Sequence, residues 1–277
     1  MTTTETTTAT TTETTTALAR SRAYLADQRR AIIGRSLAAS LSGVLPVPFL
    51  DTWLLGAILG RGYRKIAAAH QIDLDDAAVR TLVFGTEPPP SLTDMASAGI
   101  AVRIASRAAR RMMLVLTAIN RARSAARTFT VMTLFDHYCA RLHTGAALDG
   151  ETALALREEI GRAIEGTPGA LAVHPFRRGV VAAVRATLRA PLELADLATG
   201  GAVRKLLARK SEVTEAEAVD DLDAAVERAL ASKTSFLGRA AVAVEIQLSA
   251  EVNPFLEGAI ESLDRRWRAR VAVRQPR

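Results

Sequence analysis

Residues 37–60, LAASLSGVLPVPFLDTWLLGAILG, decide the fold because they hold two apolar segments separated by a proline turn. Proline lacks a backbone N–H and clashes with the preceding helical turn, so Pro46 and Pro48 end the first segment. Asp51 follows at once and has the side chain to cap the first turn of a second helix. The stretch therefore predicts a helical hairpin that turns over residues 46–51.

The two arms of this hairpin extend beyond the quoted stretch. Apolar residues at helical spacing predict a first helix over 17–45 and a second over about 51–70. Gly56, Gly60 and Gly62 give the second helix little side-chain bulk, which allows a neighbour to approach closely. Neither arm reaches the roughly 20 uninterrupted apolar residues of a bilayer span. We expect a hairpin buried in the protein or lying shallowly in a bilayer interface.

The rest of the chain also has helical periodicity. Asp73, Asp75 and Asp76 suit the positive end of a helix dipole and predict that a helix starts there. No segment has the alternating pattern of a β-strand. The sequence predicts an all-α protein of packed helical hairpins, with further helices over 73–84, 95–142, 149–165, 176–189, 191–209, 214–232, 236–250 and 254–271.

Composition agrees with a helical globular protein and suggests its organisation. The chain has 277 residues, of which 49% are hydrophobic, 23% charged and only 4% aromatic. Residues 1–16, MTTTETTTATTTETTT, have no apolar face to bury, so we expect a disordered threonine-rich tail. We predict an N-terminal helical unit over 17–148, which contains the apolar hairpin, and a C-terminal helical unit over 149–277.

Charge suggests an anionic partner. The net charge is +7, and residues 95–135 contain arginines but no acidic residue. Arginine suits phosphate contacts, and a basic amphipathic helix is typical of attachment to an anionic membrane surface. The candidate anion-binding residues are Arg103, Arg107, Arg110, Arg111 and Arg121. The alternative is a solvated face whose arginines pair with the acidic block at 212–227.

Residues with reactive side chains are few. Asp136, His137, Cys139 and His143 lie close in sequence, but the two histidines lack the i, i+4 spacing that places two metal ligands on one helix face. There is no CxxC, HExxH, P-loop or GxSxG pattern. We expect no catalytic, cofactor or metal site. One alternative remains, an enzyme that uses Cys139 as nucleophile with His143 one turn away.

The motif around the turn resembles a known family. The residues Pro46, Pro48 and Asp51, followed by an IAAAHQID segment at 66–73, resemble the IPxPxxD turn and IAxxYGxD segment of the YcjF-like, GTPase-associated bacterial helical domains of unknown function, and less closely the EcsC-like proteins. Here His70 and Gln71 stand where Tyr and Gly are usual. The resemblance spans roughly 37–145. It implies a bacterial, membrane-associated helical protein, some of whose relatives act with GTPases, and it carries over no catalytic residue.

These observations lead to one functional hypothesis and two alternatives. We expect a non-enzymatic helical adaptor or scaffold in the cytoplasm, peripheral to the inner face of a bacterial membrane. Its partner would be the anionic membrane surface or another protein, and the resemblance implies a GTPase. The alternatives are a nucleic-acid-associated basic protein, which would use the same arginines on phosphates, and an uncharacterised enzyme using Cys139.

Overall fold

The computed structural model describes residues 23–42, 50–87, 107–171, 173–178, 215–232, 235–250 and 254–274. Several predictions fall outside this part of the chain. They are the threonine-rich tail at 1–16, Pro46 and Pro48 of the turn, Arg103, nearly all of the helix predicted at 176–189 and the whole of that at 191–209. In the described residues the all-α prediction is confirmed, since helices form the body of the protein.

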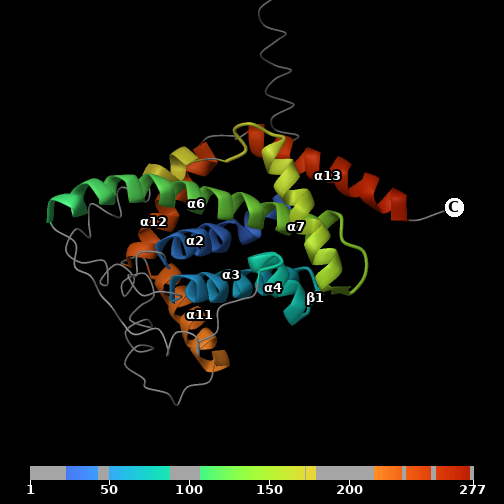
Figure 1. The fold of residues 1–277 in the computed structure, drawn as a ribbon, viewed down its shortest axis with the longest axis horizontal. Coiled ribbons are helices and arrows are strands. Elements are labelled where there is room, and N and C mark those ends of the chain that lie inside the picture. The colour runs from blue at the N-terminus through green and yellow to red at the C-terminus, as the bar shows by residue number, and fades with distance from the viewer. Residues whose placement is uncertain are drawn as a thin grey trace, which may run out of the picture.

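Three long helices lie side by side at the centre. They are α2 (Ala26–Ser42), which follows the short 3-10 helix η1 (Ala23–Leu25), α3 (Leu50–Ala69) and α6 (Arg107–Arg141) (Figure 1). Helix α2 packs against both of the others. Its residues 32–40 are all buried, because α2 has neighbours on every side. The predicted hairpin is confirmed in its two arms, with seven residues joining α2 to α3.

Glycines on α3 let its neighbours approach closely. A Cβ atom at Gly62 would lie 2.5 Å from Met132 Cε of α6 and 2.8 Å from Arg35 Cδ of α2. A Cβ atom at Gly56 would lie 2.5 Å from the Phe84 ring. All three distances are too short for a real Cβ atom, so these glycines permit the observed packing, as the sequence predicted.

Two short strands correct the expectation that strands are absent. Strands β1 (Asp73–Leu74) and β2 (Ala147–Leu148) pair in parallel, with Leu74 opposite Leu148. Two residues are too few for a period of two to be visible. Because Asp73 belongs to β1, helix α4 (Asp76–Phe84) begins three residues later than predicted.

Each strand leads into a helix that an aspartate caps. The Asp75 side chain accepts a hydrogen bond from the Ala78 N–H at the start of α4. The Asp149 side chain likewise accepts from the Thr152 N–H at the start of α7 (Gly150–Glu165). Such caps satisfy helical N–H groups that have no partner within the helix. The chain therefore repeats the order long helix, strand, aspartate cap and helix.

The end of α3 adopts a defined stop. The Ile72 N–H donates to the Ala67 carbonyl at 2.9 Å and the Gln71 N–H donates to the Ala68 carbonyl at 3.0 Å, which is the Schellman arrangement. Gln71 has a φ of 59°, a left-handed conformation that glycine adopts more readily. This stop turns the chain into β1 and places His70 beside α6.

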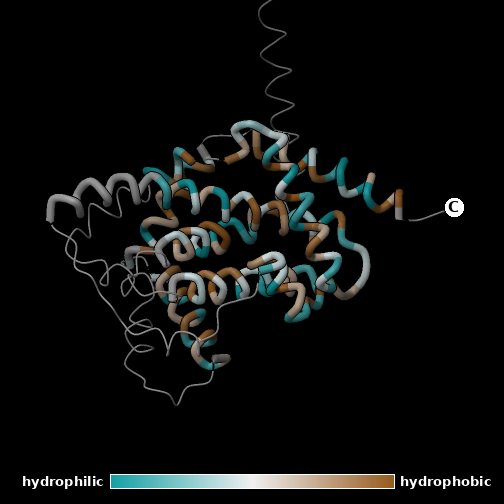
Figure 2. The backbone as a smooth tube through the Cα atoms, viewed as in Figure 1, coloured by the Kyte–Doolittle hydropathy of each residue, from teal (hydrophilic) through white to brown (hydrophobic). Residues whose placement is uncertain are grey.

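Three helices close the C-terminal part of the described chain. They are α11 (Glu215–Ala231), α12 (Phe236–Ala250) and α13 (Pro254–Arg274). Helix α12 packs on α2, α11 on α3 and α13 on α7, so residues from both sides of the predicted boundary at 148/149 join one apolar core. Figure 2 shows polar and apolar positions alternating along α13, and near its end the Val273 side chain is 84% exposed.

Candidate functional site

The described arginines of the predicted basic face occupy two different parts of α6. Arg107, Arg110 and Arg111 lie in the first two turns of this helix, and Arg121 lies near its middle. The Arg121 guanidinium donates a hydrogen bond to the backbone oxygen of Ser40 on α2, and its burial lowers the pKa of the side chain. Arg121 thus contributes to helix packing, which the sequence did not predict.

The acidic block on α11 pairs with bases of the hairpin. Asp223 and Glu227 each lie within 3.0 Å of both the Arg35 guanidinium and the Lys65 ammonium group. Arg35 is only 2% exposed. The hydrogen bond from Lys65, followed by that from Arg35, holds the pKa of Glu227 below its usual value. We name Arg35, Lys65, Asp223 and Glu227 the hairpin clasp.

The predicted turn lies at the edge of the described structure. Asp51 is the second residue of α3, within its first turn. In the described ranges, no helix is both long enough and apolar enough to cross a bilayer.

The second half of α6 carries two partly buried histidine–carboxylate contacts. The His137 Nε2 atom lies 2.6 Å from Asp264 Oδ1 on α13, and the His70 Nε2 atom lies 2.7 Å from Asp136 Oδ1. His137 also contacts the Tyr24 hydroxyl through Nδ1. When Nε2 donates to Asp264, Nδ1 accepts a hydrogen bond from the Tyr24 hydroxyl. We name Tyr24, His70, Asp136, His137 and Asp264 the sealed cluster.

The sealed cluster has the order of groups that activates a nucleophile, carboxylate then imidazole then hydroxyl. Such chemistry also needs space for a substrate beside the hydroxyl. None of the five residues lines either cavity described below. Asp136 is fully buried, and this burial raises the pKa of its carboxyl group despite the opposing effect of His70. The cluster joins η1, the turn after α3, α6 and α13.

Cys139 and His143 do not form the pair considered for an enzyme. The Nδ1 atom of His143 lies 3.1 Å from the Tyr138 hydroxyl, and no hydrogen bond joins it to Cys139. Burial, and next the negative charge of Asp136, raises the pKa of the Cys139 thiol. A nucleophilic cysteine requires the opposite shift. In the described part of the chain, no three His, Cys, Asp or Glu side chains cluster closely enough to hold a metal ion.

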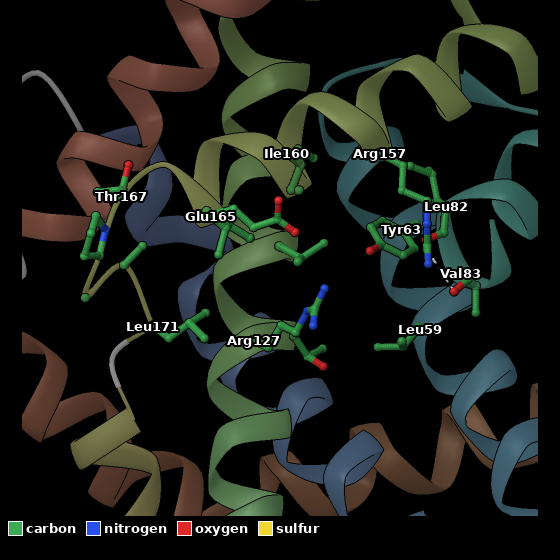
Figure 3. Close-up of a pocket in the computed structure, with 17 residues that line it drawn as sticks. Leu59, Tyr63, Leu82, Val83, Arg127, Arg157, Ile160, Glu165, Thr167 and Leu171 are labelled. Atoms are coloured by element: carbon green, nitrogen blue, oxygen red, sulfur yellow. Dashed lines mark hydrogen bonds between the residues drawn. The ribbon is translucent and has the colours of Figure 1, made fainter.

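A cavity of about 490 Å³ opens between α3, α4, α6 and α7 (Figure 3). We name it the α7 cavity. Its walls are mainly apolar and include Leu59, Leu82, Val131, Ile160 and Ile164. The loop that follows α7 closes one side with Leu171. The volume falls in the range of small-molecule sites, about 300 to 1,000 Å³.

Polar groups from several elements reach the α7 cavity. The Tyr63 hydroxyl points into it from α3, and Arg127 and Glu165 extend their charged ends into it from α6 and α7 (Figure 3). Arg157 also lines the cavity, where its guanidinium donates hydrogen bonds to the carbonyls of Leu82 and Val83. Burial raises the pKa of Tyr63 to about 12, so its hydroxyl stays protonated at neutral pH.

A second cavity of about 610 Å³ lies between α3, α4 and α11. Arg61, Arg64 and Arg80 line it. Two of these bases already have carboxylate partners, since Arg64 pairs with Asp76 and Arg61 with Asp220. The hydrogen bond and charge of Arg64 lower the pKa of Asp76. These ion pairs leave the second cavity less suited to a charged ligand than the α7 cavity.

Comparison with known proteins adds no relative. No family model matches the chain, and neither the curated proteins nor the solved structures contain a match.

Sequence reasoning missed the residues of the α7 cavity. Tyr63, Arg127, Arg157 and Glu165 come from three helices and form no local motif. The one signal within a single helix is the i, i+4 spacing of Arg157, Gly161 and Glu165, which puts a glycine between two charges on one face of α7. That pattern indicates a polar helix face that lacks a side chain at Gly161, but it does not identify the elements that pack against this face.

Proposed function

We propose that this protein is a non-enzymatic helical adaptor that attaches to an anionic membrane surface through the first turns of α6. It would act in the cytoplasm, peripheral to the inner face of a bacterial membrane. Arg107, Arg110 and Arg111 would supply the attachment, and the folded body would present a surface to a protein partner. The resemblance of the 46–73 region to GTPase-associated domains suggests a GTPase as that partner.

One observation carries this proposal, namely the hairpin clasp. The alternative expectation was that the acidic block neutralises the α6 arginines, but Asp223 and Glu227 pair with Arg35 and Lys65. Asp220 similarly pairs with Arg61. These three acids are therefore already engaged with bases of α2 and α3. Each arginine near an anionic bilayer contributes about 1 kcal/mol, and salt weakens the effect.

Vesicle flotation tests the proposal. The full chain is mixed with vesicles of phosphatidylcholine alone or with phosphatidylglycerol added, across a salt series. We expect binding only to the anionic vesicles, and we expect the triple variant Arg107→Gln, Arg110→Gln, Arg111→Gln to bind about 100-fold more weakly, since three arginines at about 1 kcal/mol each are removed.

A matched control separates this site from net charge. The variant Arg177→Gln, Arg228→Gln, Arg239→Gln removes the same charge from exposed positions outside α6. It should bind vesicles nearly as well as the parent protein. Equal losses in the two variants, binding to neutral vesicles, or retention of duplex DNA by the parent protein at the same salt would each contradict the proposal, and the last would favour a nucleic-acid partner.

A further inference from the structure

We propose that the α7 cavity is a binding site for a small amphipathic monoanion, an apolar chain that ends in a carboxylate. This inference is independent of membrane attachment, because the cavity lies among α3, α4, α6 and α7 and uses none of the arginines at the start of α6. Three features carry it: a donor on the cavity wall that no described protein group uses, an excess of positive charge and a gap at a glycine.

The donor is the Tyr63 hydroxyl. Tyr63 is only 3% exposed, and its ring packs edge-on against Phe135 at a centroid distance of 4.9 Å. Its hydroxyl points into the cavity and makes no hydrogen bond with any group in the described ranges (Figure 3). The hydroxyl therefore lies at the wall of the cavity as a donor that no described protein group uses, and a ligand acceptor can take the place of water there.

The charges favour an anion. Arg127 and Arg157 place two positive charges on the cavity, against one negative charge from Glu165. Arg157 is engaged with the Leu82 and Val83 carbonyls. Neither Arg127 nor Glu165 forms an ion pair within the described structure, and Figure 3 shows both charged ends directed toward the same part of the cavity. A carboxylate there would accept hydrogen bonds from Arg127 and Tyr63 together.

The apolar walls fit the remainder of the ligand. Leu59 and Leu82 face the cavity from α3 and α4, while Ile160 and Ile164 face it from α7. Among the described residues, no charged group other than the three already named lines it. An alkyl chain would bury its surface on these side chains while its head stays at Arg127, which is the arrangement of most small-molecule sites.

Gly161 provides the gap and the means to test it. It lines the cavity one turn from both Arg157 and Glu165, so the three residues share one face of α7. A Cβ atom added at Gly161 would meet no atom within 4 Å. A larger side chain at this position therefore fills the space that a ligand would occupy without striking the backbone of a neighbour.

Isothermal titration calorimetry with dodecanoate, kept below its micelle concentration and without vesicles, tests the proposal on the full chain. We expect saturable binding to the parent protein. Gly161→Phe should abolish it, Arg127→Gln should weaken it about tenfold, and Gly161→Ala should leave it nearly unchanged. Dodecyltrimethylammonium, which has the same chain and a positive head, should not bind.

Several outcomes would overturn the assignment. They are the absence of dodecanoate binding, equal binding of the cationic amphiphile, and unchanged binding in Gly161→Phe. Circular dichroism establishes that each variant is folded, and Ile164→Phe provides a second way to fill the cavity should Gly161→Phe not fold. Failure here would leave vesicle attachment intact, because the two assays share neither residues nor probe.

Discussion

The sealed cluster and the α7 cavity show that reactive residue types and available space occur in different places in this protein. The sealed cluster holds two histidines, two aspartates and a tyrosine, and its groups bond to one another across helix contacts. The α7 cavity holds a tyrosine, two arginines and a glutamate beside about 490 Å³ of space. The first region joins helices, whereas the second can receive a molecule.

This contrast explains why residue type alone misleads. Asp136, His137 and Cys139 attract attention in the sequence as potential catalytic or metal-binding groups. In the structure they face other helices and are buried. Tyr63 and Arg127 belong to no motif, yet they line a cavity and lack partners in the described chain. Whether a polar group already has a protein partner is therefore more informative than its chemical type.

The largest expected effect concerns the reactivity of Cys139. Because burial and the nearby Asp136 raise the pKa of its thiol, the native protein should react with a disulfide reagent at pH 8 about a thousandfold more slowly than the same protein in urea. The rate in urea serves as the control, because it reports the same thiol in the unfolded chain. Rapid labelling of the native protein would contradict the burial of Cys139 and would favour the hypothesis of an enzyme that uses Cys139 as its nucleophile.

The next largest effect concerns the hairpin clasp. The double variant Asp223→Ala, Glu227→Ala leaves the buried Arg35 without a carboxylate and should lower the free energy of unfolding by about 3–5 kcal/mol in urea denaturation. The cavity-lining Glu165→Ala should change it by less than about 0.5 kcal/mol, because Glu165 has no ion pair in the described structure.

A third variant separates the charge of the clasp from its volume. Arg35→Met keeps most of the buried side-chain volume, and Lys65 still neutralises both acids, so the loss should be well below that of the double variant. If Glu165→Ala lowered the free energy of unfolding as much as the double variant does, the contrast between the ion-paired charges of the clasp and the unpaired charge of the cavity would be wrong.

A smaller effect of opposite sign is expected in the α7 cavity. Gly161→Ala should raise the free energy of unfolding by about 1 kcal/mol, because alanine favours the helix and its Cβ atom meets nothing within 4 Å. Thermal or urea unfolding measures it. The same change at Gly62, where a Cβ atom would lie 2.5 Å from Met132, should destabilise the protein. Destabilisation by Gly161→Ala would mean that the cavity is filled.

Much of the fold was predictable because it depends on local patterns. The two arms of the hairpin followed from apolar spacing and prolines, and the predicted bounds of the helix at 236–250 agree with α12. The close approaches at Gly56 and Gly62 followed from small residues on a helix. Helix propensity, capping and hydrophobic periodicity each depend on a few neighbouring residues, so they can be identified in a single sequence without knowledge of the tertiary structure.

The pairing of distant residues was not predictable from those patterns. Strands β1 and β2 have two residues each, and only their contact identifies them as strands. The acidic block was visible, but the choice between the α6 arginines and the hairpin bases depended on where α11 packs. The α7 cavity likewise arises from four helices and a loop, so no single stretch of the sequence indicates it.

The matched pair Tyr24→Phe and Tyr63→Phe tests the central claim most directly, because each variant removes one hydroxyl group. The Tyr24 hydroxyl bonds to His137 in the sealed cluster, so its loss should lower the free energy of unfolding in urea by about 1–3 kcal/mol. The Tyr63 hydroxyl has no partner in the described chain, so its loss should change that free energy by less than about 0.5 kcal/mol or raise it. Equal losses in the two variants, or a larger loss in Tyr63→Phe, would contradict the division between groups that join helices and groups available to a ligand.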